Sequence, residues 1–295
     1  MTTTTSPLPA AHRASPIPAA VAEPHGPAVR SSARSSTGNR SRISTGTALR
    51  SEWVKLRTVR STWAAAGGAA VLSLGLAAIS AASQMSQWDG MTPEQRADVD
   101  PTATALVGVL FATVIFGSMG VRSVTAEYSS GMIRQTFAAV PRRRAVLLAK
   151  VVDLAVLALP VAVVANVVSF LLAQSILASK GVEAALGDPG VAGAIVYGSL
   201  AVTAVVVLGV GLGAVLRRTA FATSLVSVLI IGSQIFAVSV PSGARPYLPG
   251  LALQATVTVS PSDDLLGPVA GLLVLAAYAA VAIIGAAWLI EKRDA

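Results

Sequence analysis

The sequence predicts an all-α integral membrane protein that crosses the bilayer six times, with both termini in the cytoplasm. Three observations lead to this prediction. Hydrophobic residues make up 54% of the 295 residues and charged residues only 12%, which raises the mean hydropathy to +0.69. Six apolar stretches each reach the roughly 20 residues that a helix needs to cross a bilayer. Basic residues alternate strictly from one connection to the next, as the positive-inside rule requires.

The N-terminal segment has a different composition from the rest of the chain. Residues 1–47 are rich in Ser, Thr, Pro, Ala and Arg and show no sustained apolar periodicity, which is typical of a disordered tail. We therefore divide the chain into a disordered cytoplasmic tail, 1–47, and a six-helix domain, 48–295. The sequence has no cysteine, and both histidines, His12 and His25, lie in this tail, so we expect no thiolate or histidine metal site.

The stretch LRSEWVKLRTVRSTW, residues 49–63, predicts an amphipathic interfacial helix before the first span. Its apolar residues at helical spacing are Leu49, Trp53, Leu56 and Trp63. The basic residues Arg50, Lys55 and Arg57 fall off this stripe, so one face would be apolar and the other charged. A plain basic and aromatic flank of the first span is the alternative.

The six apolar stretches predict the membrane spans. They lie near 62–83, 102–121, 145–178, 191–216, 219–240 and 265–290. The third contains Asp153 near its start, so its first turns should project out of the hydrocarbon. We expect Asp153 to pair locally with Lys150, three residues earlier.

The lysines and arginines between the spans predict the orientation. One side receives fourteen of them: Arg50, Lys55, Arg57, Arg60, Arg122, Arg134, Arg142, Arg143, Arg144, Lys150, Arg217, Arg218, Lys292 and Arg293. The other side receives three, Arg96, Lys180 and Arg245, together with most of the acidic residues. The basic side is therefore predicted to be cytoplasmic. Topology and contact with anionic lipid account for the net charge of +8 better than nucleic acid does.

No catalytic or nucleotide-binding motif is present. The chain lacks GxxxxGK[ST], HExxH and GxSxG, so we expect neither enzymatic activity nor a bound cofactor in this chain. Gly209 and Gly213 form a GxxxG pair inside the fourth apolar stretch, which favours close packing of helices.

Few polar residues lie within the spans. Ser224, Ser227 and Gln234 are spaced by three and seven, which places them on one face of a regular fifth helix. Asn166, Ser227 and Gln234 are candidates for a translocation path. Hydrogen bonding between helices is the simpler interpretation.

The connection between the second and third spans is longer than two adjacent helices need. Its sequence is AEYSSGMIRQTFAAVPRRRAVLLAK, residues 126–150. Gly131 can end the second helix, residues 132–140 can form a short helix, and Pro141 begins a basic approach to the third span. An apolar stripe of Met132, Ile133 and Phe137 would dock this short helix on lipid or in the groove of a partner.

Residues 126–150 and 49–63 together resemble the membrane subunits of type 2 ABC exporters, especially short actinobacterial permeases. The resemblance covers about 49–293 and implies a permease of the cell membrane that pairs with a second copy of itself or a homologous permease. It also implies a separate ATP-binding cassette subunit, which carries the ATP and Mg²⁺ and contacts residues 49–60 and 131–140. The implied coupling residues are Trp53, Glu127, Gly131, Met132, Ile133, Phe137, Pro141 and Arg142. Glu127, Gly131, Pro141, Arg142 and Lys150 match the family pattern, whereas Met132 replaces its usual threonine.

The resemblance implies that the chain couples ATP hydrolysis by its partner to export of a small or amphiphilic molecule. Two alternatives stay open: an ion-coupled secondary transporter, and a non-transporting membrane scaffold or sensor. The outward loop, residues 241–264, is rich in proline and apolar in its middle. It either dips back into the outer leaflet, as in relatives, or is a plain extracellular loop.

Overall fold

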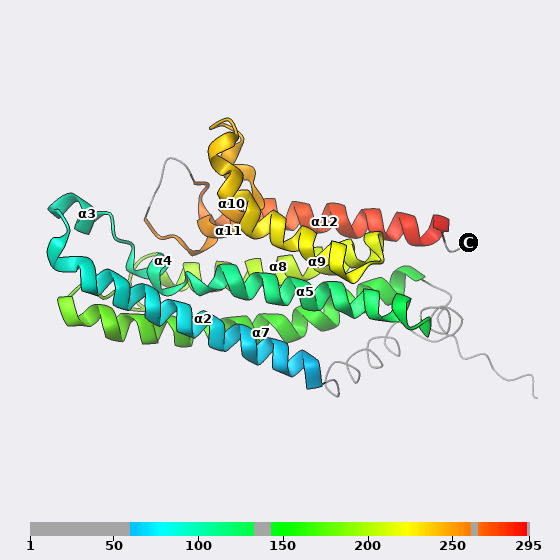
Figure 1. Ribbon diagram of the computed structural model, residues 1–295, viewed down its shortest axis with the longest axis horizontal. Coiled ribbons are helices and arrows are strands. Elements are labelled where there is room, and N and C mark those ends of the chain that lie inside the picture. The colour runs from blue at the N-terminus through cyan, green and yellow to red at the C-terminus, as the bar shows by residue number, and fades with distance from the viewer. Residues whose placement is uncertain (1–59, 133–142, 261–264, 294–295) are drawn as a thin grey trace, which may run out of the picture. The chain divides into compact units, whose positions relative to one another are not determined.

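The computed structural model describes residues 60–132, 143–260 and 265–293 (Figure 1). Every regular element within these residues is helical. Six of the helical segments are long and apolar enough to cross a membrane, so the predicted all-α, six-span fold is confirmed. The predicted tail, 1–47, and the segment 49–59 with Trp53 lie outside the described residues.

The spans are formed by α2 (Arg60–Gln87), α5 (Gly108–Ser129), α7 (Arg143–Leu177), α8 (Val191–Leu216), α9 (Thr219–Ser227) with its continuation, and α12 (Pro268–Arg293). The fifth span continues from α9 through a π-helical turn, η3 (Val228–Gly232), into α10 (Ser233–Phe236) and η4 (Ala237–Ser239). The shorter helices are η1 (Trp88–Gly90), α3 (Pro93–Ala97), α4 (Pro101–Ala105), η2 (Ala178–Lys180), η5 (Arg245–Tyr247) and α11 (Pro249–Val257).

The described spans alternate in direction (Figure 1). We call the end at which α2, α7 and α9 begin, and at which α5, α8 and α12 finish, the basal end. The opposite end, which carries α3, α4 and α11, is the distal end. The basal end is the side that the positive-inside count predicts to be cytoplasmic.

The second span differs most from its predicted bounds of 102–121. Residues 101–105 form the separate helix α4, because the Asp100 side chain caps its first turn and Pro101 occupies its first position. At the other end, α5 continues as far as Ser129. The fourth span, by contrast, has the bounds that were predicted, 191–216.

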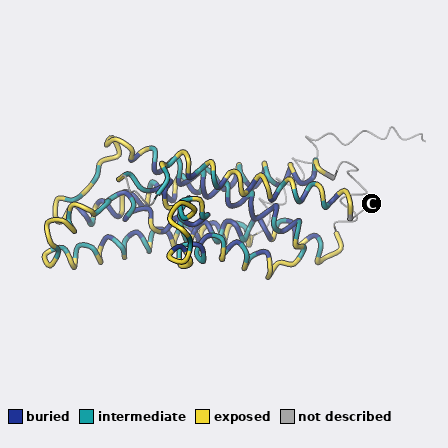
Figure 2. Tube along the Cα trace, turned by 90° about the horizontal axis from the view of Figure 1, so that it is seen from above, coloured by how far each residue is buried: buried dark blue, intermediate teal, exposed yellow. Residues whose placement is uncertain are grey.

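Helix α8 lies at the centre of the packing. It contacts α5, α7, α9, α11 and α12, and most of its residues are buried. Figure 2 shows the buried stretches where the helices face one another and exposed turns at the distal end. A helix built from glycine, alanine and valine suits this position, because small side chains let neighbouring helices approach closely.

The seam between α5 and α8 is built on glycine. A Cβ atom at Gly209 would collide with the carbonyl oxygen of Gly117, and one at Gly213 would lie 2.8 Å from the carbonyl oxygen of Val121. A Cβ atom at Gly120 would in turn collide with the carbonyl oxygen of Val206. The packing role predicted for Gly209 and Gly213 is therefore what the structure shows, and glycines on α5 complete the seam.

Candidate functional site

The candidate site is the basal end of α5, where the chain enters the predicted coupling segment. After Ser129 the helix stops, with the amide of Ser130 donating to the carbonyl of Ala126 at 3.1 Å. Gly131 follows with a φ of +72°, a left-handed conformation that a side chain would strain. The helix therefore ends just before Gly131, where the sequence predicts the break.

Only part of the predicted coupling set falls within the described residues. Met132 directly follows the helix end and is exposed. Ile133, Phe137, Pro141 and Arg142 lie outside the described residues, as does Trp53. Their contact with an ATP-binding subunit stays a prediction, and Glu127, Gly131 and Met132 define where the segment leaves the helices.

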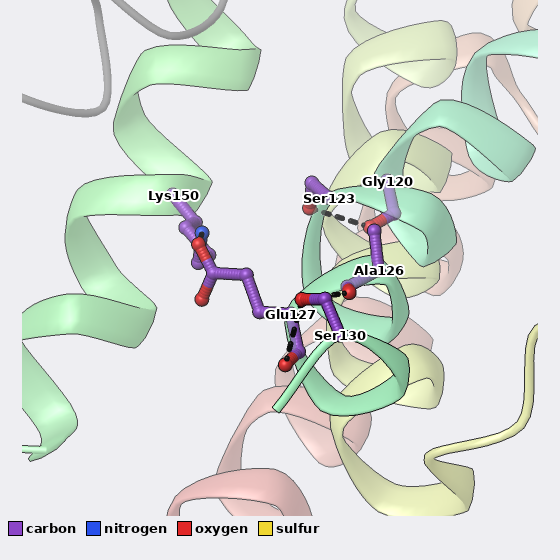
Figure 3. A network of polar contacts seen from close by, with 6 residues as sticks. All are labelled: Gly120, Ser123, Ala126, Glu127, Ser130 and Lys150. Carbon is purple, nitrogen blue, oxygen red and sulfur yellow. Dashed lines mark hydrogen bonds and ion pairs between the residues drawn. The ribbon is translucent and has the colours of Figure 1, made fainter. Parts of the chain in front are cut away.

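Glu127 and Lys150 form an ion pair between α5 and α7. The Lys150 Nζ lies 2.7 Å from the Glu127 Oε1, and the two side chains are only 4% and 9% exposed. In Figure 3 they extend toward one another from separate helices. Losing either partner would leave a buried charge without this counter-ion, which is costly in a protein interior. The pair therefore joins the two helices that flank the coupling segment.

This bridge was missed by the sequence analysis, which predicted a local partner for Lys150 in Asp153. Asp153 lies one helical turn from Lys150 on α7 and is buried as well. Spacing along one helix could suggest the local pair, but it could not show that α5 extends to Glu127 and lies beside α7. The signal in the sequence that could have pointed to this ion pair is that Glu127 and Lys150 both match the family pattern.

A second set of contacts joins α5 to the turn between α8 and α9. The guanidinium of Arg217 lies 4.6 Å from the centre of the Tyr128 ring, a cation–π contact. The Thr219 hydroxyl, at the start of α9, donates to the Thr125 hydroxyl at 2.8 Å. Arg217 itself has a φ of 55°, which turns the chain sharply between two spans. The basal end of α5 is thus tied to three other spans.

A third contact joins α7 to α12 at the surface. The Arg144 guanidinium donates to the Glu291 carboxylate, with 2.6 Å between Nη2 and Oε2. Lys292 directly follows Glu291, and its ammonium lies 4.1 Å from the centre of the exposed Trp288 ring, about one turn earlier on α12. The Arg144 and Glu291 side chains are 63% and 47% exposed, so solvent weakens this ion pair relative to the buried one.

The three predicted path residues lie in separate places. Asn166 is buried and donates to the Ser199 hydroxyl on α8 at 3.0 Å. The Ser227 hydroxyl donates to the carbonyl of Thr223 within α9, and the Gln234 amide donates to the carbonyl of Gly250 at 3.2 Å. Asn166 and Gln234 therefore bond between helices, as the simpler interpretation expects, whereas Ser227 bonds within its own helix. A role of the three residues in a translocation path stays a prediction.

The expectation that Ser224, Ser227 and Gln234 share one face of a regular helix is wrong. The π-helical turn at Val228–Gly232 lies between Ser227 and Gln234. A π-turn contains more residues than an α-turn, so it shifts the register of every residue that follows. Gln234 consequently meets the helix α11 instead of continuing the face of the two serines.

The comparison with protein families decides the identity of the chain. Residues 48–234 match the family model described as ABC-2 family transporter protein. The chain belongs to the ABC-2 transporter family. The match supports the type 2 ABC permease resemblance and, with the six apolar helices, shows a multi-pass membrane protein. No curated protein matches the sequence significantly.

The matched range contains the first four spans, most of the fifth and the whole predicted coupling segment of this ABC-2 permease. Helices α11 and α12 lie beyond it. Family members of this kind are the membrane components of transporters, which agrees with the absence of catalytic motifs from the sequence. The described site is a junction at which α5 contacts α7, α8 and α9.

The distal end of the permease contains a second structured region that includes α11. Seven of the nine residues of α11 are buried, and α11 packs against α8 and α12. Residues 249–257 of the predicted outward loop are therefore helical and largely buried, and a re-entrant course through the outer leaflet stays a prediction. At its start, the Gly250 amide donates to the Ser233 hydroxyl at 2.8 Å, beside the bond from Gln234.

Asp100 holds the other end of this segment. One carboxylate oxygen accepts from the amides of Thr102 and Ala103 in α4, each at 2.9 Å. The second oxygen accepts from the amides of Val259 and Ser260, at 2.8 and 3.0 Å. In the sequence, Asp100 is simply one of the acidic residues on the side that receives few lysines and arginines. The Asp-Pro pair at 100–101 signals the helix cap, but no local pattern signals the bond to residues so far along the chain.

Proposed function

We propose that this ABC-2 permease forms the membrane pathway of an exporter whose ATP is hydrolysed on a separate ATP-binding subunit. The subunit would dock on residues 131–142, and on 49–60, at the basal end. The basal end is then cytoplasmic, the membrane is the cell membrane, and a second copy or a homologous permease completes the pathway. The cargo would be a small or amphiphilic molecule. The buried Glu127–Lys150 ion pair at the base of the docking segment carries this proposal.

The ion pair supports the proposal because of where it lies. The docking segment leaves α5 at Gly131 and returns to the chain at the start of α7. Glu127 lies four residues before the exit, and Lys150 lies two turns after the return. A push on the segment by a closing ATP-binding subunit would act on both helices at once. The pair keeps them from separating, so the push becomes a displacement of α5 and α7 together.

The other contacts of α5 extend this displacement to the rest of the permease. Tyr128 and Thr125 join it to Arg217 and Thr219 at the α8–α9 turn. The glycine seam leaves almost no room between α5 and α8, so these helices would move as one rigid body. Coupling of this kind requires that the subunit bind the two states of the permease with different affinity.

The first experiment tests whether the permease binds an ATP-binding subunit. The tagged full-length chain is purified from gently solubilised native membranes, beside a variant in which residues 131–144 are scrambled. Recovery of an ATP-binding cassette protein with the parent and not with the scrambled variant is expected. A well-folded parent that repeatedly recovers no such protein, with export that an uncoupler abolishes, would refute the proposal in favour of ion-coupled transport.

The second experiment tests whether the Glu127–Lys150 pair couples the permease to the ATP-binding subunit. The permease and its ATP-binding subunit are reconstituted in nanodiscs, and the ATPase rate with the parent is compared with Glu127→Gln and with the control Glu291→Gln. The Glu127→Gln permease should still bind the subunit, but the ATPase rate of the subunit should no longer depend on the permease. The Glu291→Gln permease should bind the subunit and give the same ATPase rate as the parent. Equal behaviour of the two variants would remove the ion pair from the mechanism.

A further inference from the structure

The strongest feature outside the junction is a cavity at the distal end, between α5, α10 and α11. Its volume is about 160 Å³. The residues that line it include Ala103, Leu106, Val109, Leu253, Gln234 and Gln254. Most are aliphatic, and none of these described residues carries a charge. The chemistry of the lining therefore disfavours an ionised group.

Two amides interrupt the aliphatic lining. Gln234 donates to the carbonyl of Gly250, and its own carbonyl oxygen accepts nothing from the described residues. The Gln254 side chain has no hydrogen-bond partner among the described residues. Two amides offering a free acceptor and free donors beside an apolar surface can bind a hydroxyl or an amide, and they provide no net charge.

The walls of the cavity are held in place before any ligand arrives. Ser233 and Gln234 bind the first turn of α11, and Asp100 binds the chain just after it. The same carboxylate caps α4, whose residue Ala103 belongs to the lining. Because both ends of α11 are anchored to neighbouring elements, a ligand would not have to order this wall when it binds.

We propose that this cavity is a subsite for the head of an uncharged amphiphile that carries a hydroxyl or amide group. Cavities that hold a whole drug-sized molecule measure roughly 300–1,000 Å³, so about 160 Å³ accommodates one end of such a molecule. The remainder would extend along the lipid-facing surface. Binding of the amphiphile is argued from the cavity alone. Only the statement that this amphiphile is the exported cargo rests on the proposed function.

The test uses the full chain in nanodiscs without any ATP-binding subunit. Three diazirine probes share a decyl chain and differ in their headgroup: N-methylglucamide, trimethylammonium or sulfate. Mass spectrometry should find the neutral probe attached to residues 103–110 or 253–258. The labelling of these residues by the neutral probe should be about fivefold higher than by either charged probe. One neutral hydrogen bond corresponds to a change of this size. Equal labelling by all three probes, or labelling elsewhere, would overturn the proposal.

Three variants sharpen the result. Gln254→Leu should lose about fivefold of the neutral labelling at an unchanged elution volume, whereas Gln87→Leu, an exposed glutamine at the same end, should keep it. Equal labelling of the two variants counts against the subsite. Because the chain has no cysteine, Gln254→Cys places a single thiol at the cavity. A disulfide-linked dimer of this variant in native membranes would show that a second copy covers the cavity, and would also overturn the proposal.

The assay separates the two proposals. Selective labelling without recovery of an ATP-binding subunit would leave the subsite standing and remove the proposed function. Recovery of the subunit with unselective labelling would do the reverse.

Discussion

Removal of one partner from the Glu127–Lys150 pair should destabilise the permease strongly. Glu127→Met leaves the ammonium of Lys150, 4% exposed, without its counter-ion on α5, and such a loss costs roughly 3–5 kcal/mol. Lys150→Met should cost a similar amount, because it leaves the buried carboxylate of Glu127 without this cation. The double variant removes both charges and should cost clearly less than the two single changes added together.

The assay is the free energy of unfolding of the full chain in mixed micelles, followed by titration with SDS. The four proteins of the cycle should give a coupling energy of about 2 kcal/mol or more between Glu127 and Lys150. Glu291→Gln, which breaks an exposed pair at the same end, serves as the control and should change the stability little. If Glu127→Met behaves like this control, or if the cycle shows no coupling, the pair does not join α5 to α7 as inferred.

Three further predictions concern the seam, the distal anchor and the topology. In size-exclusion chromatography, Gly209→Leu should abolish the monodisperse elution peak, because the leucine side chain would collide with the α5 backbone. The control Gly75→Leu, at a glycine with open space around it, should elute like the parent. Asp100→Ala should speed hydrogen exchange of the four amides that it binds by about fivefold, because each bond contributes about 1 kcal/mol. Unchanged exchange of these amides would refute the anchor. A membrane-impermeant thiol reagent should label Gly187→Cys in intact cells and Ser130→Cys only after lysis, and the opposite result would reverse the predicted orientation.

Several features of the fold follow from local physics, and the sequence predicts them. The length of an apolar stretch determines whether a helix can cross hydrocarbon, so six spans could be counted without a structure. Gly131 ends α5 because only glycine adopts its left-handed conformation without strain. The fourth span, which has no charge and no proline, has the bounds that were predicted.

Other features depend on irregularities that periodicity does not reveal. The π-helical turn at Val228–Gly232 has no charged residue or proline to signal it, and it redirects Gln234 toward α11. Helix α4 was merged with the second span because its residues are apolar enough to continue that stretch. In both cases the packing of neighbouring elements decides the backbone conformation.

The sequence by itself determined the fold class, the number of spans, the GxxxG packing pair and the helix end at Gly131, because each depends on residues within one or two turns of each other. Only the tertiary structure decided that Lys150 meets Glu127 and that Asp100 meets Val259 and Ser260. These partners lie 23 and about 160 residues apart along the chain. A charge or a carboxylate can be recognised in a sequence, but its partner is set by which helices pack side by side, and that choice depends on the whole fold.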